Sequence, residues 1–230
     1  MTNEQVLEQI KGGLIVSCQA LETEPLYDSY IMSRMAFAAQ EGGAVGIRAN
    51  TVKDIKEIKK TVNLPIIAII KRVYEKSDVY ITPTEKEVDE LVNEGAEIIA
   101  VDATNRIRPD GKTFEEFFGI IRKKYPQQLF MADTSCFEEG KLAFELGCNL
   151  IGTTMCGYTE YTKDKSIPAF DLIKRYSDEL GAAVIAEGGI WTPEQLAKAY
   201  ESGAYSAVVG TAITRPRDIT RRFVSVLKNR

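Results

Sequence analysis

The chain has 230 residues, of which 44% are hydrophobic and 27% are charged, as in an ordinary globular protein. Its net charge of −4 argues against a nucleic-acid or membrane surface as partner. It contains no histidine. This excludes Ser-His-Asp and Cys-His catalysis in their usual forms, so any proton transfer must fall to Lys, Glu, Asp, Tyr or Cys.

The four cysteines are scattered and show no Cys-x-x-Cys spacing, which is typical of reduced thiols rather than of disulfides or a zinc site. No apolar run approaches the ~20 residues of a membrane-spanning helix. The acidic residues show no close Asp-x-Asp spacing, so we expect no bound metal. Together these observations predict a cytoplasmic protein.

The first dozen residues predict a helix, because Val6, Leu7 and Ile10 recur at helical spacing. We expect this helix to be an extra element that packs against the body of the protein. Eight short apolar runs follow, roughly one every 20 to 30 residues. Most are continuous, as in parallel strands buried on both faces. They cover residues 14–17, 44–47, 66–70, 98–101, 129–132, 150–153, 183–186 and 206–209.

Helix-start patterns lie between these runs. Thr192 is followed by Pro193 and Gln195, and capping boxes are also predicted at Thr84 with Glu87 and at Ser135 with Glu138. The alternation predicts an α/β protein, a (β/α)₈ TIM barrel with an extra N-terminal helix, as a single domain over residues 1–230. An open doubly wound sheet is the alternative, although eight units favour the barrel.

Two glycine turns follow the last two runs. Glycine lets backbone N–H groups approach an anion closely, and the loops after strands 7 and 8 of such barrels commonly bind phosphate. Arg215 is placed to join this site. We therefore expect a phosphorylated small molecule to bind there. The turns contain Gly188, Gly189, Gly210 and Thr211.

One polar residue or glycine follows each apolar run, where barrels carry their chemistry. Burial and a nearby cation such as Arg48 would lower the pKa of Lys71 toward that of a useful base. Glu187 is expected to be a second acid/base group, or alternatively an ion-pair partner of Lys71. We expect Asp133 to contact substrate, whereas Asp102 could bind a ligand or form a salt bridge. The full set is Gln19, Arg48, Lys71, Asp102, Asp133, Thr154, Glu187 and Gly210.

The polar loop from Gly157 to Asp164 is a lid or simply an exposed loop, and Tyr158 is its most interesting residue. After Pro216, apolar residues recur at helical spacing, which predicts either a final barrel helix or a dimer contact. These residues are Ile219, Phe223, Val226 and Leu227.

Fragments with a recognisable pattern lie at residues 15–21, 44–50, 69–72, 131–133, 151–154 with 157–159, 184–188 and 212–216. In order and over nearly the whole chain, they resemble the N-acetylmannosamine-6-phosphate 2-epimerase family. The resemblance implies a barrel that converts N-acetylmannosamine 6-phosphate to N-acetylglucosamine 6-phosphate without a cofactor, in sialic acid breakdown. It implies catalytic roles for Lys71 and Glu187, and homodimers whose C-terminal helices pack across the interface. It also implies sugar-phosphate contacts from Gln19, Arg48, Asp133 and Arg215.

The residues fit that chemistry, because a neutral Lys71 could take the proton from C2 of the open-chain sugar. Two alternatives stay open. One is a lyase or aldolase in which Lys71 forms a Schiff base with a phosphorylated carbonyl compound. The other is a protein that binds a sugar phosphate without turning it over.

Overall fold

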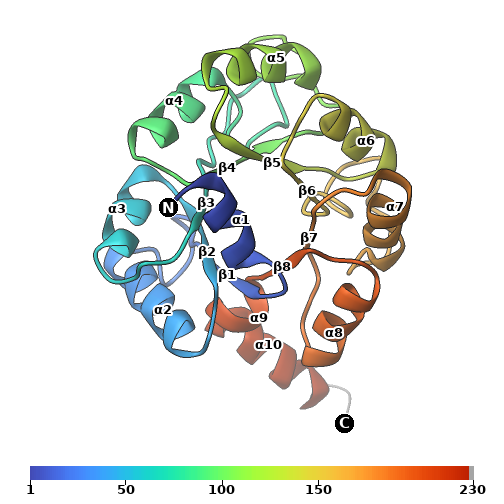
Figure 1. Ribbon diagram of the computed structural model, residues 1–230. Coiled ribbons are helices and arrows are strands. Elements are labelled where there is room, and N and C mark those ends of the chain that lie inside the picture. Colours follow the sequence, from blue (N-terminus) through green and yellow to red (C-terminus); the bar gives the residue numbers. More distant parts are fainter. Residues whose placement is uncertain (228–230) are drawn as a thin grey trace.

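Eight parallel strands close into a barrel in which each strand pairs with its neighbours in sequence and β8 pairs with β1 (Figure 1). The computed structural model describes residues 1–227. The predicted TIM barrel is confirmed, and the open-sheet alternative is wrong. The strands are β1 (Leu14–Cys18), β2 (Gly46–Asn50), β3 (Ile66–Ile69), β4 (Ile98–Asp102), β5 (Leu129–Asp133), β6 (Leu150–Gly152), β7 (Val184–Glu187) and β8 (Ser206–Val209).

Helices surround the barrel on its outside, with α2 to α8 forming a ring (Figure 1). The helices are α1 (Asn3–Ile10), α2 (Ser29–Glu41), α3 (Val52–Lys59), α4 (Glu85–Asn93), α5 (Phe114–Lys124), α6 (Phe137–Glu145), α7 (Phe170–Leu180), α8 (Pro193–Glu201), α9 (Thr211–Thr214) and α10 (Pro216–Leu227). The capping box predicted at Thr192 is present. The box predicted at Ser135 is shifted by one residue, because the Glu139 carboxylate accepts from the backbone N–H groups of both Ser135 and Cys136.

Side chains alternate between the two faces of each strand. Ile47 and Ala49 of β2 lie in the apolar layer beneath the helices. The alternation therefore places Arg48 and Asn50 inside the barrel. The apolar run predicted to end at Ile47 is thus only the beginning of β2, and Arg48 lies in the middle of this strand.

The extra helix α1 closes one end of the barrel. Val6 and Ile10 are buried against apolar side chains of the barrel interior, including Ile98 and Leu129. In Figure 1, α1 lies across the centre of the ring of strands. The site must therefore open at the other end, where the strands have their carboxyl ends.

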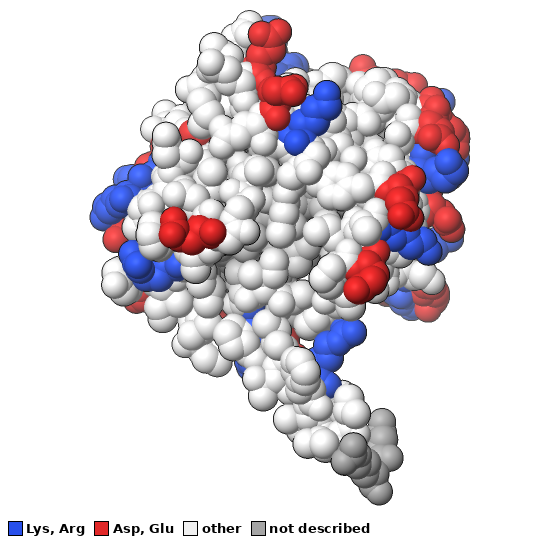
Figure 2. Space-filling view, turned by 60° about the horizontal axis from the view of Figure 1, so that its bottom comes forward, with Lys and Arg blue, Asp and Glu red and all other residues white. Residues whose placement is uncertain are grey.

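The last helix, α10, differs from the others because none of its described residues is buried. It begins at Pro216 and stands out from the barrel beside a face with few charged side chains (Figure 2). Phe223 is 75% exposed. Of the helices in residues 1–227, none combines the length and apolar character needed to cross a membrane.

Candidate active site

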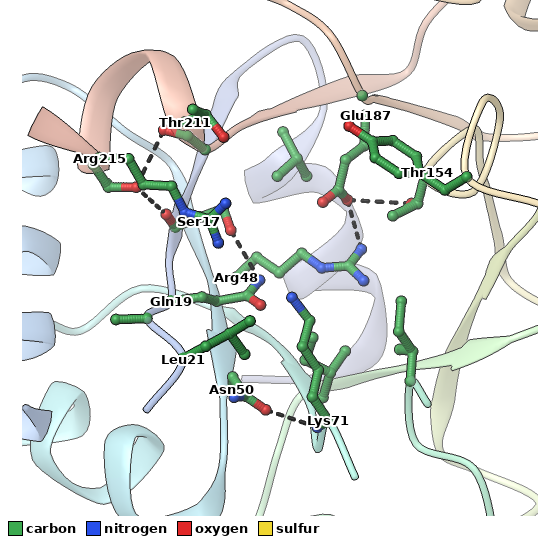
Figure 3. A pocket seen from close by; sticks show the side chains of 18 of the residues that line it. Ser17, Gln19, Leu21, Arg48, Asn50, Lys71, Thr154, Glu187, Thr211 and Arg215 are labelled. Atoms are coloured by element: carbon green, nitrogen blue, oxygen red, sulfur yellow. Dashed lines mark hydrogen bonds and ion pairs between the residues drawn. The ribbon is translucent and has the colours of Figure 1, made fainter. Parts of the chain in front are cut away.

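A cavity of about 1020 Å³ lies at the carboxyl ends of the strands (Figure 3). Most of the predicted site residues line it, although they come from widely separated parts of the chain. These residues are Gln19, Arg48, Lys71, Thr154, Tyr158, Glu187, Gly188, Gly189, Gly210, Thr211 and Arg215. Of the residues predicted to contact substrate, Asp133 does not line the cavity.

Arg48 is the centre of a buried ion-pair network. Its side chain is 1% exposed and donates to both carboxylate oxygens of Asp133, at 3.1 and 2.5 Å. Its Nη1 also donates to Glu187 Oε2 at 2.5 Å. Burial alone disfavours the guanidinium charge, but the two carboxylates outweigh it and raise the pKa of Arg48. Arg48 is thus a fixed cation that orients two acidic side chains.

Asp133, the last residue of β5, lies behind Arg48 and is fully buried. Besides its bonds to Arg48, it accepts a hydrogen bond from Thr154 Oγ1 at 2.6 Å. It is absent from the cavity lining, and its expected contact with substrate stays a prediction.

Lys71 comes after the end of β3, and its backbone N–H donates to Asn50 Oδ1 at 2.8 Å. Burial and the charges of Arg48 and Arg215 together lower the pKa of Lys71 to about 8, against the opposing effect of Glu187. Within residues 1–227, Lys71 forms no ion pair with Glu187. A substantial fraction of this amine is therefore neutral close to physiological pH.

Glu187 ends β7 on another side of the cavity from Lys71 (Figure 3). Burial raises the pKa of its carboxyl to about 7, with Asp133 adding to the shift and Arg48 opposing it. Thr153 fixes its backbone, since its hydroxyl donates to the Glu187 carbonyl at 2.9 Å. The cavity thus holds an amine and a carboxyl group that both titrate near neutrality, which suits proton transfer.

The two glycine turns form one wall of the cavity. Gly188 and Gly189 have φ values of +110° and +74°, and the short helix α9 begins just after Gly210. Within residues 1–227, the backbone N–H groups of Gly188, Gly189 and Thr211 have no acceptor. Arg215 lines the same part of the cavity. Free N–H groups beside a cation are the features that bind a phosphate.

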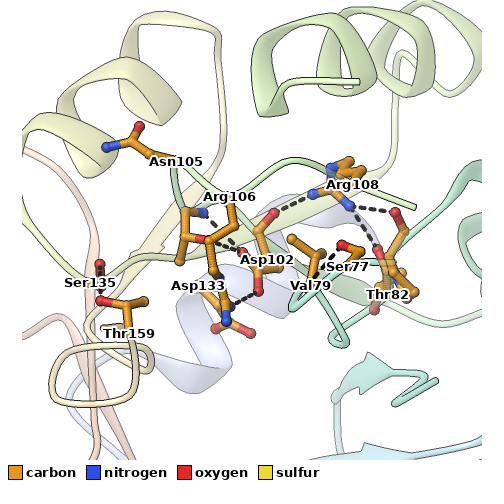
Figure 4. A network of polar contacts seen from close by, with 12 residues as sticks. Ser77, Val79, Thr82, Asp102, Asn105, Arg106, Arg108, Asp133, Ser135 and Thr159 are labelled. Atoms are coloured by element: carbon orange, nitrogen blue, oxygen red, sulfur yellow. Dashed lines mark hydrogen bonds and ion pairs between the residues drawn. The ribbon is translucent and has the colours of Figure 1, made fainter. Parts of the chain in front are cut away.

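Asp102, whose role the sequence left open, belongs to a separate network (Figure 4). Its carboxylate pairs with Arg106 at 2.5 Å and accepts from Thr104 Oγ1 at 2.6 Å. It does not line the cavity. Among residues 1–227, there is no group of three or more Cys, Asp or Glu side chains that could hold a metal ion.

The sequence did not single out Asn50 or Thr153, although both hold parts of the site. Asn50 lies two residues after Arg48 on β2, so the alternation of side chains would have placed both in the barrel. The short helix α9 also had no signal, because four residues are too few for a periodic pattern.

The fold and the site together define a (β/α)₈-barrel protein whose cavity combines an anion-binding wall with groups able to exchange protons. The chain belongs to the N-acetylmannosamine-6-phosphate epimerase family. The profile of that family, described as "Putative N-acetylmannosamine-6-phosphate epimerase", matches residues 32–229.

Individual relatives agree with the family match. Proteins named "Putative N-acetylmannosamine-6-phosphate 2-epimerase" from Caldanaerobacter subterraneus and Listeria welshimeri are each 53% identical to this chain. Each match covers 98% of this chain, and it covers 95% and 97% of the two relatives.

A solved structure of the N-acetylmannosamine-6-phosphate 2-epimerase from Clostridium perfringens superimposes with a TM-score of 0.91 at 52% identity, covering 96% of this chain and 95% of that one. The thiamine phosphate pyrophosphorylase of Pyrococcus furiosus matches at a TM-score of 0.62 and 14% identity, with coverage of 94% and 92%. That second likeness shows the fold alone.

Proposed function

We propose that this protein is an epimerase that interconverts N-acetylmannosamine 6-phosphate and N-acetylglucosamine 6-phosphate. Its relatives with this named activity are similar over almost the whole chain, which supports the reaction. The mechanism rests on one observation: Lys71 and Glu187 line the same cavity. The pKa of Lys71 is lowered and that of Glu187 is raised, so both are able to exchange protons near neutral pH.

In the open-chain sugar, C2 lies next to the C1 aldehyde, so the C2 proton becomes acidic once the enolate is stabilised. Neutral Lys71 takes this proton, and the electron pair of the C2–H bond forms the C1–C2 double bond. Return of a proton to the opposite face of C2 gives the epimer. Glu187 either supplies that proton or opens and closes the sugar ring, and its pKa of about 7 suits both roles.

Arg48 and Asp133 act through Glu187. Their ion pairs hold the Glu187 carboxylate on its side of the cavity, and Asp133 is a positioning residue in this scheme. The phosphate binds remotely to the glycine turns and Arg215. That binding energy orients C2 over Lys71 without taking part in the chemistry. The proton leaves and returns without net oxidation, so the reaction requires no redox cofactor.

We also propose a cytoplasmic, single-domain homodimer that works in amino-sugar and sialic acid breakdown. The exposed apolar residues of α10 support the dimer, because Phe223, Val226 and Leu227 are 75, 63 and 61% exposed in one chain. A partner subunit that packs against α10 would remove this apolar surface from water.

The activity is tested by incubating the protein with N-acetylmannosamine 6-phosphate, with and without a chelator, and measuring N-acetylglucosamine 6-phosphate. We expect turnover in both samples. Lys71→Met should abolish it while sugar-phosphate binding persists, whereas near-normal activity of this variant would contradict the assigned base. Borohydride treatment with substrate distinguishes the lyase alternative, which requires a reduced adduct on Lys71.

A further inference from the structure

The carboxamide of Asn50 joins the end of β2 to the backbone of Lys71. Asn50 is 4% exposed and lines the cavity. Its Oδ1 accepts the Lys71 backbone N–H at 2.8 Å (Figure 3). Because a backbone N–H can only donate, this bond fixes which end of the carboxamide is oxygen. The amide nitrogen is therefore held on the other side.

The Asn50 amide nitrogen has no acceptor within residues 1–227. The fully enclosed side-chain atoms that lack a partner there are Gln19 Oε1, Arg48 Nε and Arg217 Nε. Asn50 Nδ2 is not one of them, so this nitrogen is reachable from the cavity. It is a preoriented hydrogen-bond donor next to the Lys71 backbone, and the described residues offer it no acceptor.

The guanidinium of Arg48 is less available to a substrate than the Asn50 amide, because its Nε has no partner but is fully enclosed. Nη1 and Nη2 of Arg48 bind Asp133 and Glu187. These two carboxylates offset the charge of the guanidinium. The reaction needs a donor to the oxygen on C1, because that oxygen gains negative charge when the C2–H bond breaks.

We propose that Asn50 is a further catalytic residue, whose Nδ2–H donates to the C1 oxygen of the substrate as the enolate forms. The inference rests on the proposed function. In this step Lys71 receives the C2 proton, the C2–H electron pair becomes the C1–C2 double bond, and the carbonyl π pair moves onto the C1 oxygen. Asn50 stabilises that oxygen without transferring a proton.

A neutral amide suits this position better than a cation would. Each positive charge beside Lys71 changes its protonation, as Arg48 and Arg215 do. An amide stabilises the oxygen through its hydrogen bond alone. The same carboxamide holds the Lys71 backbone through Oδ1, so the donor keeps a fixed position relative to the segment that carries the base.

The test is Asn50→Asp, which keeps an oxygen for the Lys71 N–H but removes the donor. Asn149→Asp is the matched control, because Asn149 Oδ1 likewise accepts a backbone N–H, from Phe130 at 3.0 Å, just before the start of β6. We expect Asn50→Asp to lower kcat about 10²- to 10³-fold, as removal of one oxyanion donor does. Asn149→Asp should stay within about twofold of the parent protein.

The pH dependence separates loss of the donor from a charge effect. A carboxylate at position 50 would raise the pKa of Lys71 and shift the activity to higher pH. We expect the loss of kcat to persist on the high-pH plateau, with slowed exchange of the C2 proton in heavy water and little change in KM. Full recovery of kcat on that plateau would overturn the proposal.

A second variant keeps the test decisive if the first one does not fold. Should Asn50→Asp not fold, Asn50→Ala, judged folded by circular dichroism, should lose kcat at least as strongly. A kcat within threefold of the parent in either folded variant would also overturn the donor role. Failure of the proposed function itself would look different, because the parent protein would then neither epimerise the substrate nor exchange its C2 proton.

Discussion

Replacement of Lys71 by methionine should make the protein more stable while it removes the catalytic base. Methionine has a similar length and no charge, so it fills the same space without the need to bury an ammonium group. Burial and the neighbouring arginines Arg48 and Arg215 lower the pKa of Lys71 from 10.5 to about 8, a change that corresponds to about 3 kcal/mol. The buried Lys71 therefore lowers the free energy of unfolding of the protein.

The size of the effect depends on pH in a defined direction. Between pH 8 and 10.5 the unfolded chain binds more protons at Lys71 than the folded protein, so the lysine destabilises less as the pH rises. The destabilisation is complete below pH 8. We expect Lys71→Met to raise the free energy of unfolding at pH 7 by up to about 3 kcal/mol. The gain should shrink steadily toward pH 10.5.

Urea unfolding at a series of pH values measures this gain. Lys60→Met is the control, because the Lys60 side chain is 66% exposed and its replacement should change stability by less than about 0.5 kcal/mol. A Lys71→Met protein that is no more stable than the parent at pH 7 would refute the argument. So would a gain that does not change with pH.

Three further predictions concern the phosphate-binding wall, the pKa of the base and the dimer contact. Gly189→Ala would place a Cβ 2.9 Å from Ile167 at a φ of +74°. We expect the free energy of unfolding, measured in urea, to fall by about 1–3 kcal/mol and the KM to rise. An unchanged KM would contradict phosphate binding at this wall. Arg215→Met removes a cation that lowers the pKa of Lys71. The midpoint of the pH–rate profile for C2 exchange should therefore move to higher pH. A midpoint that does not move would argue against an effect of Arg215 on Lys71. Phe223→Glu puts a charge on the exposed apolar surface of α10, which should yield monomers in sedimentation, whereas an intact dimer would exclude that surface.

The sequence predicted best those features that depend on a pattern of neighbouring residues. Lys71 and Glu187 could be predicted because each comes at the end of a continuous apolar run, and chain order brings such ends to one face of a barrel. The N-terminal helix was equally predictable, since Val6 and Ile10 recur at helical spacing and both are buried.

Long-range pairing accounts for most of what was missed. Arg48 marked the end of an apolar run, but β2 continues to Asn50 because carboxylates 85 and 139 residues further along the chain neutralise that arginine. A hydrophobic pattern does not report such partners. The same limit applies to Asp133, whose place behind Arg48 depends on packing across the barrel. The pattern after Pro216 predicted a helix, but it did not indicate which surface that helix would pack against.

The most direct test of the mechanism is proton NMR of N-acetylmannosamine 6-phosphate incubated with the protein in heavy water. We predict that the C2 proton signal disappears as the second epimer forms, and that neither change occurs with Lys71→Met. Formation of N-acetylglucosamine 6-phosphate that fully retains the original C2 hydrogen would contradict proton removal by a side chain in exchange with water.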